Sequence, residues 1–291
     1  MPNLKEVKTR ISSVVSTQQI TKAMKMVAAA KLRRAQDNII QMRPYAQKLG
    51  EILQNVSAGI ETEGNVYSTV RPEENVLIIS VSSDRGLCGP FNSNIFKATA
   101  AHIEANYKSQ FADGNVTILP IGKRSNDFFS KRDFNVNSDY FELFSDLTFE
   151  NARKIAEFAM KNFEEGKFDR VDIVYNEFKN VATQIIREEQ FLPIPEKVEV
   201  ENTDVENDYI FQPNQDVIVE QMIPKSLKVQ LFKAVLESFA AEHGARMTAM
   251  DKATENAGEL LRDLRLTYNQ TRQAAITKEI LEIVGGADAL G

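Results

Sequence analysis

Two glycine-bearing turns are the places where this sequence could bind a nucleotide. The first, Ser82–Pro90, follows an apolar run and has glycines three residues apart, without the G-x-G-x-x-G spacing that holds a dinucleotide. The second is Gly122-Lys123, but Thr117 stands where a phosphate-binding loop has glycine and Arg124 where it has Ser or Thr. Ordinary turn glycines explain both segments better than a phosphate site does.

Metal and nucleophile chemistry also lack the residues that they require. The histidines are His102 and His243 and the one cysteine is Cys88, so the sequence contains no His/Cys cluster with the spacing of a zinc site. Cys88 has no histidine near it in sequence, which favours an inert thiol over a nucleophile. The sequence therefore predicts no catalytic residue, no metal and no cofactor.

The composition of the chain argues against a membrane-spanning or secreted protein. The chain has 291 residues, 43% of them hydrophobic, and no apolar run approaches the roughly 20 residues that cross a bilayer. Its first residues lack the basic-then-apolar layout of a secretory signal, and a single cysteine fits a reducing compartment. We therefore expect a cytosolic protein, of two structural units or one elongated unit, that can still dock onto a membrane complex.

Charge is unevenly distributed along the chain. Residues 1–35 contain eight basic side chains against Glu6, a local net charge of +7 in a chain whose net charge is −6. Such a basic arm suits an acidic partner, either nucleic acid or an acidic protein surface, and a solvated helix face is the alternative. Nucleic acid is the weaker choice because the arm has no aromatic residue before Tyr45 on which bases could stack.

The first 56 residues follow one alternating three-four register, which is polar only at Gln18, Thr21 and Lys25. The register comprises Leu4, Val7, Ile11, Val14, Gln18, Thr21, Lys25, Ala28, Leu32, Ala35, Ile39, Met42, Ala46, Leu49, Leu53 and Val56. A sustained seven-residue repeat predicts a coiled-coil helix, here roughly 80 Å long, which Pro44 should kink.

A second apolar stripe lies off this seam and consists of Ile20, Met24 and Val27. It can pack against a third helix or form a surface that touches another subunit. The pattern alone does not decide between the two.

The C-terminal end of the chain predicts a second long helix. Pro224 suits its first turn, residues 225–284 contain no proline, and Gly285-Gly286 supplies a stop. Its apolar side is expected to comprise Met250, Ala253, Ala257, Leu260 and Leu264, extended by Ile276, Ile280 and Ile283. The partner of this side is the N-terminal helix, because two such seams would otherwise stay exposed.

The middle of the chain alternates between strand and helix patterns. Gly59, Gly64 and Pro72 mark a linker before it, and an acidic loop, Leu192–Asp216, follows it. Strands are predicted at Val76–Val81, Val116–Leu119, Val171–Tyr175 and Val181–Ile186, with a turn at Asn176–Asn180 between the last two, and helices near 93–108 and at Phe149–Phe163. This order predicts a small, largely parallel α/β sheet with an antiparallel final hairpin.

Several long motifs closely resemble those of the gamma subunits of F-type ATP synthases. They are Thr17–Lys31 (TQQITKAMKMVAAAK), Arg43–Tyr45, Ser83–Gly89 with Asn92, Ala245–Ala257 and Tyr268–Ala287. The resemblance runs from end to end and is least distinctive over residues 110–215.

The resemblance implies a fold and a division of the chain. The fold class is α plus α/β: a long antiparallel two-helix coiled coil from the N- and C-terminal helices, and a small Rossmann-like α/β domain in the middle. The implied domains are an N-terminal coiled-coil helix at 1–58, an α/β foot at 73–205 and a C-terminal coiled-coil helix at 206–291 that packs on 1–58.

The resemblance also implies a role without catalysis. Family members form the rotating central stalk that couples proton flow to ATP synthesis or hydrolysis in the beta subunits. The implied partners are a ring of three alpha and three beta subunits, an epsilon subunit and the membrane rotor ring, with no nucleic acid and no bilayer insertion. The implied location is the cytoplasmic face of the bacterial inner membrane, as a peripheral protein, and the basic arm would meet acidic loops of beta.

Carried over by position, nine residues fall in segments that the family uses for coupling or partner contact. They are Met24, Asp84, Arg85, Cys88, Arg246, Arg272, Gln273, Thr277 and Glu282. Two rival classes are a stand-alone α/β nucleotide enzyme, which the missing phosphate loop disfavours, and a coiled-coil scaffold or nucleic-acid-binding rod, which the dense motifs disfavour.

Overall fold

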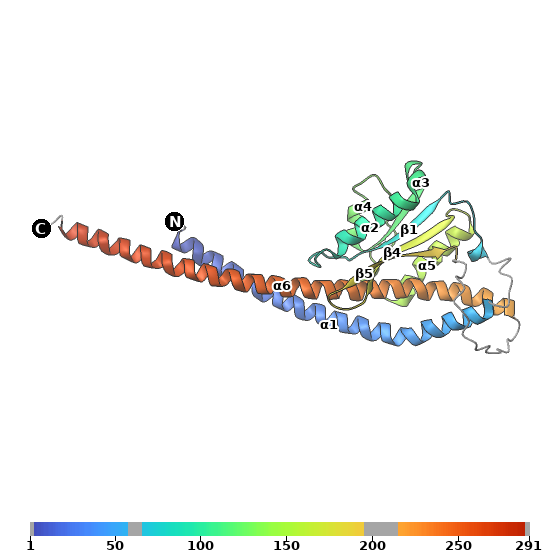
Figure 1. Cartoon of the computed structure of the whole chain (residues 1–291), viewed down its shortest axis with the longest axis horizontal. Helices are drawn as coiled ribbons and strands as arrows, with labels where there is room; N and C mark the ends of the chain where they lie inside the picture. The colour runs from blue at the N-terminus through green and yellow to red at the C-terminus, as the bar shows by residue number, and fades with distance from the viewer. Residues whose placement is uncertain (1–2, 58–65, 195–214, 289–291) are drawn as a thin grey trace. The chain divides into compact units, whose positions relative to one another are not determined.

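A computed structural model describes residues 3–57, 66–194 and 215–288. The chain forms two compact units, one made of residues 1–29 with 246–291 and the other of residues 30–245. Two long helices, α1 (Leu4–Ser57) and α6 (Gln215–Asp288), each contribute to both units (Figure 1).

A five-stranded sheet lies in the unit of residues 30–245, with strand order β3-β2-β1-β4-β5. The strands are β1 (Val76–Val81), β2 (Val116–Ile121), β3 (Asn135–Val136), β4 (Arg170–Phe178) and β5 (Gln184–Leu192). The first four are parallel and β5 runs antiparallel to β4. The expected parallel sheet with a final antiparallel hairpin is confirmed.

Shorter helices connect these strands. They are α2 (Phe91–Asn106), α3 (Lys108–Ala112), α4 (Lys123–Phe129) and α5 (Phe149–Glu164), with 3-10 turns η1 (Val66–Ser68) and η2 (Leu143–Ser145). The two helices expected in the middle of the chain are present as α2 and α5. The short elements α3, α4 and β3 were not expected, because runs of two to seven residues carry too little periodicity to be recognised.

The predicted turn at Asn176–Asn180 is wrong. Asn176 is a buried residue of β4 that pairs with Ile186, and the hairpin turns over residues 179–183. Asn176 and Glu177 are polar, as turn residues often are, but the strand pairing continues through both of them.

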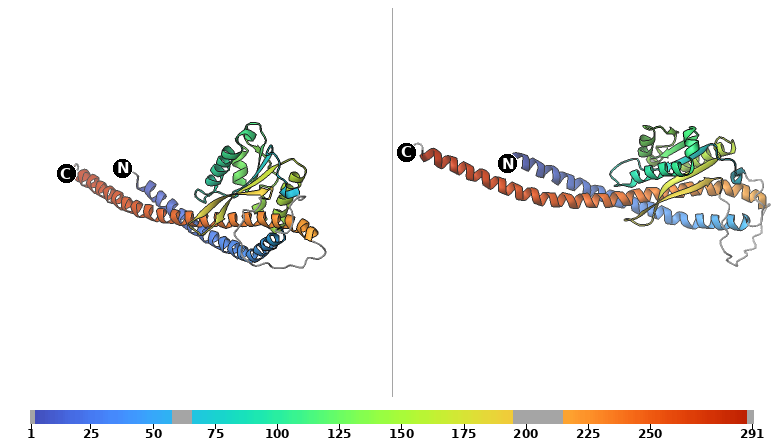
Figure 2. Two further views of the ribbon diagram at one scale, coloured as in Figure 1. Left: turned by 45° about the vertical axis from the view of Figure 1, so that its right-hand side comes forward. Right: turned by 45° about the horizontal axis from the view of Figure 1, so that its top comes forward.

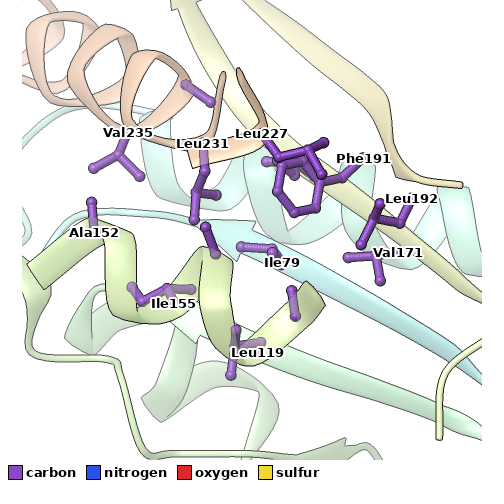
Figure 3. Close-up of a cluster of buried hydrophobic side chains, with 14 of the residues drawn as sticks. Ile79, Leu119, Ala152, Ile155, Val171, Phe191, Leu192, Leu227, Leu231 and Val235 are labelled. Carbon is purple, nitrogen blue, oxygen red and sulfur yellow. The ribbon is translucent and has the colours of Figure 1, made fainter. Parts of the chain in front are cut away.

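The sheet is covered on both faces because alternate strand residues point in opposite directions. On one face, Leu77 and Ile79 of β1 pack with α5 and with α6, the latter through Leu227, Leu231 and Val235 (Figure 3). On the other face, strand residues pack with α2 and α4 in a second cluster: Val76, Ile78, Ile118, Val174, Ile95, Ile103, Tyr107 and Phe129. Within the same unit, Leu32, Ala35 and Ile39 of α1 pack against Leu236 and Ala240 of α6.

The other unit consists of the start of α1 and the C-terminal half of α6, side by side (Figure 2). Lys25 contacts Asp251 and Thr21 contacts Thr254, so residue numbers rise along one helix as they fall along the other. The expected antiparallel pairing is confirmed. Buried seam residues of this unit are Val7, Thr21 and Ala28 from α1 and Met250, Ala257, Leu261 and Leu264 from α6. The side chains of Ala46, Leu53 and Val56 lie outside the described part of the chain.

One predicted seam position of α6 is wrong: the buried residue is Leu261 and not Leu260. Leu260 is 45% exposed, whereas its neighbour Leu261 is 6% exposed. The buried residues of α6 are Met250, Ala257, Leu261 and Leu264. The spacing after Ala257 is therefore four residues and then three, whereas the predicted spacing was three and then four.

The expected ends of α6 are also corrected. The helix begins at Gln215, so Pro224 lies inside it, and it continues through Gly285 and Gly286 to Asp288. Ile223 and Leu227, on either side of Pro224, are buried against the sheet core, so packing holds the helix together through the proline. Pro44 likewise lies inside α1. Gly59, Gly64 and most of the Leu192–Asp216 loop lie outside the described residues.

Leu261→Asp is therefore expected to destabilise the helix pair strongly, and Leu260→Asp to have little effect. Burying a leucine contributes about 1.5–3 kcal/mol, and a carboxylate in its place adds a desolvation cost. Leu32→Asp, in the seam of the other unit, should behave like Leu261→Asp. Thermal denaturation followed by circular dichroism measures all three, and a Leu260→Asp variant as unstable as Leu261→Asp would contradict the seam described here.

Candidate functional site

The polar break in the seam is filled by contacts between the two long helices. The hydroxyl oxygens of Thr21 and Thr254 are 2.8 Å apart, and Thr21 is 8% exposed. Gln18 Nε2 donates to the Thr254 carbonyl at 3.3 Å, and Lys25 Nζ lies 2.5 Å from Asp251 Oδ1. The residues that interrupt the apolar repeat thus have polar partners on α6.

A surface groove runs beside these contacts. Its lining includes Lys22, Met26 and Ala29 of α1, together with Asp251 and Thr254 of α6. The lining combines aliphatic surface with charges of both signs.

The second apolar stripe of α1 is largely open. Ile20 and Val27 are exposed, Met26 beside them is exposed as well, and Met24 is half-buried. In the chain as the structure describes it, Ile20 and Val27 therefore do not pack into the interior against a third helix. They form an apolar surface on the basic arm.

The Ser83–Gly89 motif forms a loop that several hydrogen bonds hold in place. Asp84 Oδ1 accepts a hydrogen bond from the Lys123 backbone N–H at 3.0 Å, and Ser83 N–H donates to Asn92 Oδ1 at 3.0 Å. Cys88 is 1% exposed and its sulfur accepts from Asn92 Nδ2 at 3.3 Å. The expected inert thiol is thus a buried group that fastens the loop to the start of α2.

The exposed side chains of this loop are those of Arg85 and Leu87. Leu87 is 66% exposed and has a φ of 65°, a backbone conformation that leucine rarely adopts. Leu87 could not be predicted as an exposed contact residue, because neither composition nor periodicity shows the exposure or the backbone conformation of a single leucine.

Gly122 has a structural explanation. Its φ is 100°, and a Cβ at this position would lie 2.6 Å from the Ser82 carbonyl oxygen. Glycine is therefore required where β2 ends against the loop after β1, which supports the interpretation of Gly122-Lys123 as an ordinary turn.

The remaining residues that were predicted to serve in coupling or partner contact lie on α6. Arg246 is buried, whereas Arg272, Gln273, Thr277 and Glu282 are exposed. Lys278 and Glu282 form an ion pair at 3.6 Å on this exposed segment.

The C-terminal end of α6 carries an exposed apolar surface. Continuing the register of Lys25 with Asp251 places Leu4, where α1 begins, opposite about residue 272 of α6. Beyond that point Ile276, Ile280 and Ile283 are exposed. They extend the apolar side as expected, but α1 does not cover them.

A buried charge cluster joins α2 to the sheet. The Asp172 carboxylate of β4 accepts hydrogen bonds from Tyr107, from His102 Nε2 at 2.8 Å and from Arg170 Nε at 2.9 Å. The other ring nitrogen of His102 lies 2.9 Å from Glu188 Oε2 on β5. Because both ring nitrogens face carboxylates, the cluster favours the protonated, doubly donating imidazolium.

The pKa values of the cluster shift accordingly. The hydrogen bond to Asp172 raises the pKa of His102 above its ordinary 6.5, against the opposing effect of burial. Burial alone would raise the pKa of Asp172, but the donors His102, Tyr107 and Arg170 together lower it. The cluster is therefore a structural ion network that ties one helix to two strands.

The described residues contain no metal-ligand cluster and no membrane-spanning helix. Within residues 3–57, 66–194 and 215–288, no group of three or more His, Cys, Asp or Glu side chains is arranged to hold a metal ion. None of the helices described combines the length and apolar character that a membrane span needs.

Comparison with known proteins identifies the family. A family model described as ATP synthase matches residues 3–290. The ATP synthase gamma chain of Cytophaga hutchinsonii is 58% identical over all of this chain and 99% of its own length, and that of Christiangramia forsetii is 54% identical with the same coverage. The chain belongs to the ATP synthase gamma chain family.

Solved structures agree with the fold of this gamma chain. A chain of the mitochondrial ATP synthase of Euglena gracilis matches with a TM-score of 0.64 and 20% identity, covering 99% of this chain and 94% of that one. A chain of the Tetrahymena thermophila mitochondrial ATP synthase central stalk matches with a TM-score of 0.55 and 23% identity, covering 80% of this chain and 99% of that one. At these identities the likeness concerns the fold.

The charge cluster of this gamma chain should make its stability depend on pH. Because the pKa of His102 is higher in the folded chain than 6.5, its stabilising contribution is complete below that pH and is lost as the pH rises through the folded-state pKa. His102→Gln, which keeps an amide donor but does not titrate, should cost about 1–3 kcal/mol at low pH and flatten the profile.

Thermal unfolding of both chains between about pH 6 and pH 9 provides the measurement. An NMR titration that resolves the two histidines, His102 and His243, assigns the transition to its residue. Identical pH profiles for the wild type and His102→Gln would show that the cluster does not titrate as described.

Proposed function

We propose that this chain is the gamma subunit in the catalytic head of a bacterial, proton-transporting F-type ATP synthase. In this role it is the rotating central stalk that couples proton flow through the membrane sector to ATP synthesis or hydrolysis in the beta subunits, and it helps to regulate both activities. The observation that carries the proposal is the identity of 58% to a gamma chain over the whole length of the chain.

The chain itself has no catalytic role in this proposal. Its partners are the ring of three alpha and three beta subunits, the epsilon subunit and the membrane rotor ring, and it is a peripheral protein on the cytoplasmic face of the inner membrane. The antiparallel pairing of α1 with α6 supports this role, because two helices packed along a common seam form a stiffer rod than a single helix. The mitochondrial structures with the same fold are of a central stalk and of an assembly of F1 with a c-ring.

The proposed parts of the chain keep the boundaries expected from the family: coiled-coil helices at 1–58 and 206–291 and a foot at 73–205. The proposed coupling and contact residues are Met24, Asp84, Arg85, Cys88, Arg246, Arg272, Gln273, Thr277 and Glu282. For the loop after β1, the exposed Arg85 and Leu87 are the contact groups and the buried Cys88 holds their backbone in place.

The basic arm around Met24 is the proposed contact for acidic loops of beta. Eight basic residues lie within residues 1–35, and the apolar surface of Ile20 and Val27 is exposed among them. A partner that has both acidic and apolar side chains would fit this combination of charge and apolar surface.

Met24→Lys should uncouple the assembled complex without abolishing catalysis. Met24 is half-buried at the edge of the exposed stripe, so an added ammonium group can reach solvent and pair with an acidic loop at one rotational position. An extra ion pair at one angle slows passage through that angle and leaves the catalytic sites unchanged. We expect ATP hydrolysis to persist while proton pumping falls.

Met24→Gln is the matched control, because glutamine has nearly the length of methionine and carries no charge. Assembly yield with the ring subunits, ATP hydrolysis and proton pumping are measured on the same preparations. Loss of assembly in Met24→Lys would show that the side chain belongs to the core. Normal proton pumping in a fully assembled Met24→Lys complex would refute the coupling role.

A further inference from the structure

The first turn of α4 lacks the cap that a helix usually has. The first N–H groups of a helix have no partner within it, and the side chain of the preceding residue commonly accepts from one of them. The preceding residue here is Gly122, which offers no such side chain. Another residue is excluded at this position, because its φ is 100° and a Cβ would lie 2.6 Å from the Ser82 carbonyl oxygen. Acceptors for this turn must therefore come from another segment.

The loop after β1, residues 82–90, supplies these acceptors. Three successive N–H groups of the turn each donate to one of three successive loop residues: Lys123 to Asp84 Oδ1 at 3.0 Å, Arg124 to the Ser83 carbonyl at 3.1 Å, and Ser125 to Ser82 Oγ at 2.8 Å. The Asp84 carboxylate is the acceptor that lies farthest along the loop. A negative charge at the N-terminal end of a helix also interacts favourably with the helix dipole.

The exposed residues of the loop lie between two anchored points. Arg85 directly follows Asp84, and Leu87 has a φ of 65°, a conformation that a leucine keeps only where the surrounding structure holds it. On the far side of Leu87 the buried Cys88 accepts a hydrogen bond from Asn92. On the near side the anchor is the contact of Asp84 with α4. The placement of Arg85 and Leu87 therefore depends on that contact.

We propose that Asp84 is a positioning residue, whose carboxylate caps α4 and thereby holds Arg85 and Leu87 in the orientation in which they meet a partner. The consequence for coupling rests on the proposed function. The alternative is that Asp84 touches the partner itself through its negative charge. The capping role is favoured because Asp84 is half-buried and its Oδ1 atom accepts from the Lys123 N–H.

Two conservative substitutions separate these roles, because each keeps one property of the carboxylate. Asp84→Asn keeps an acceptor oxygen at the same distance from the backbone and removes the charge, and asparagine caps helices about as well as aspartate does. Asp84→Glu keeps the charge but adds a methylene group, which moves the oxygen away from its position beside the Lys123 N–H. Asp84→Ala removes both the acceptor and the charge.

Proton pumping per ATP hydrolysed, measured on assembled complexes, gives the effect on coupling. We expect Asp84→Asn to stay near the wild-type ratio, and Asp84→Glu and Asp84→Ala to lose about half of it or more, because only asparagine preserves the cap. The opposite order, with Asp84→Glu near the wild type and Asp84→Asn as low as Asp84→Ala, would overturn the proposal in favour of a charge contact. If Asp84→Ala does not assemble, the comparison of Asp84→Asn with Asp84→Glu decides alone.

Thr148→Ala is the matched control for the loss of a helix cap. Thr148 caps α5 in the same unit, where its Oγ1 atom accepts from the Asn151 N–H at 3.3 Å. Removing either cap should lower the melting temperature of the purified chain, but only the loss of the Asp84 cap should lower the pumping ratio. An equal fall of that ratio in Thr148→Ala would overturn the proposal, and so would wild-type coupling in Asp84→Ala and Asp84→Glu.

Limited digestion of the purified full chain with trypsin reports the order of the loop without any partner. Trypsin cuts after Arg85 when the loop opens, and mass spectrometry measures the rate of that cut. The rate should rise about threefold or more in Asp84→Ala and Asp84→Glu and stay unchanged in Asp84→Asn and Thr148→Ala.

Equal rates of this cut in all variants would overturn the proposal, whatever happens to coupling. Should the wild-type chain fail to join a ring of partners and couple it, the proposed function fails. Digestion of the purified chain would then still decide whether Asp84 holds the loop.

Discussion

The structure depends on the apolar seam between α1 and α6. A helix with a long apolar stripe is stable in water only when that stripe is covered. In the unit of residues 1–29 and 246–291, Val7 and Ala28 of one helix and Ala257 and Leu264 of the other are buried for this reason. Two segments more than 200 residues apart in sequence thus form one element, which neither end of the chain can form alone.

The same helix, α6, also belongs to the core of the sheet. Leu227, Leu231 and Val235 lie on the face that α5 shares, with Ile79 of β1 beneath them. The opposite face is closed by α2, which the Asp172 cluster ties to β4 and β5 through His102. A single continuous helix therefore contributes to two cores. The core around the sheet also contains the middle of the chain, whereas the helix pair is built from the first and last segments.

Much of this arrangement could be predicted from repeating or continuous apolar patterns in the sequence. The heptads of α1 and the buried run Val76–Val81 are long or apolar enough to decide their structure, and the seam residues Leu32 and Ala35 were placed correctly. Leu260 and Leu261 are leucines at adjacent positions, and only packing against the partner helix decides which of the two is buried. The continuation of α6 through Pro224 depends on burial of Ile223 and Leu227, and the His102–Asp172 contact joins residues 70 apart. Tertiary contacts of this kind leave no periodic signal in the sequence.

We propose that the paired helices turn as one shaft. A fluorescent or bead probe on an exposed residue of α2, with the alpha and beta ring held to a surface, tests it by direct observation during ATP hydrolysis. We expect the probe to rotate in one direction for as long as ATP is hydrolysed and to stop when ATP is removed. A probe that stays still while the complex hydrolyses ATP would contradict it.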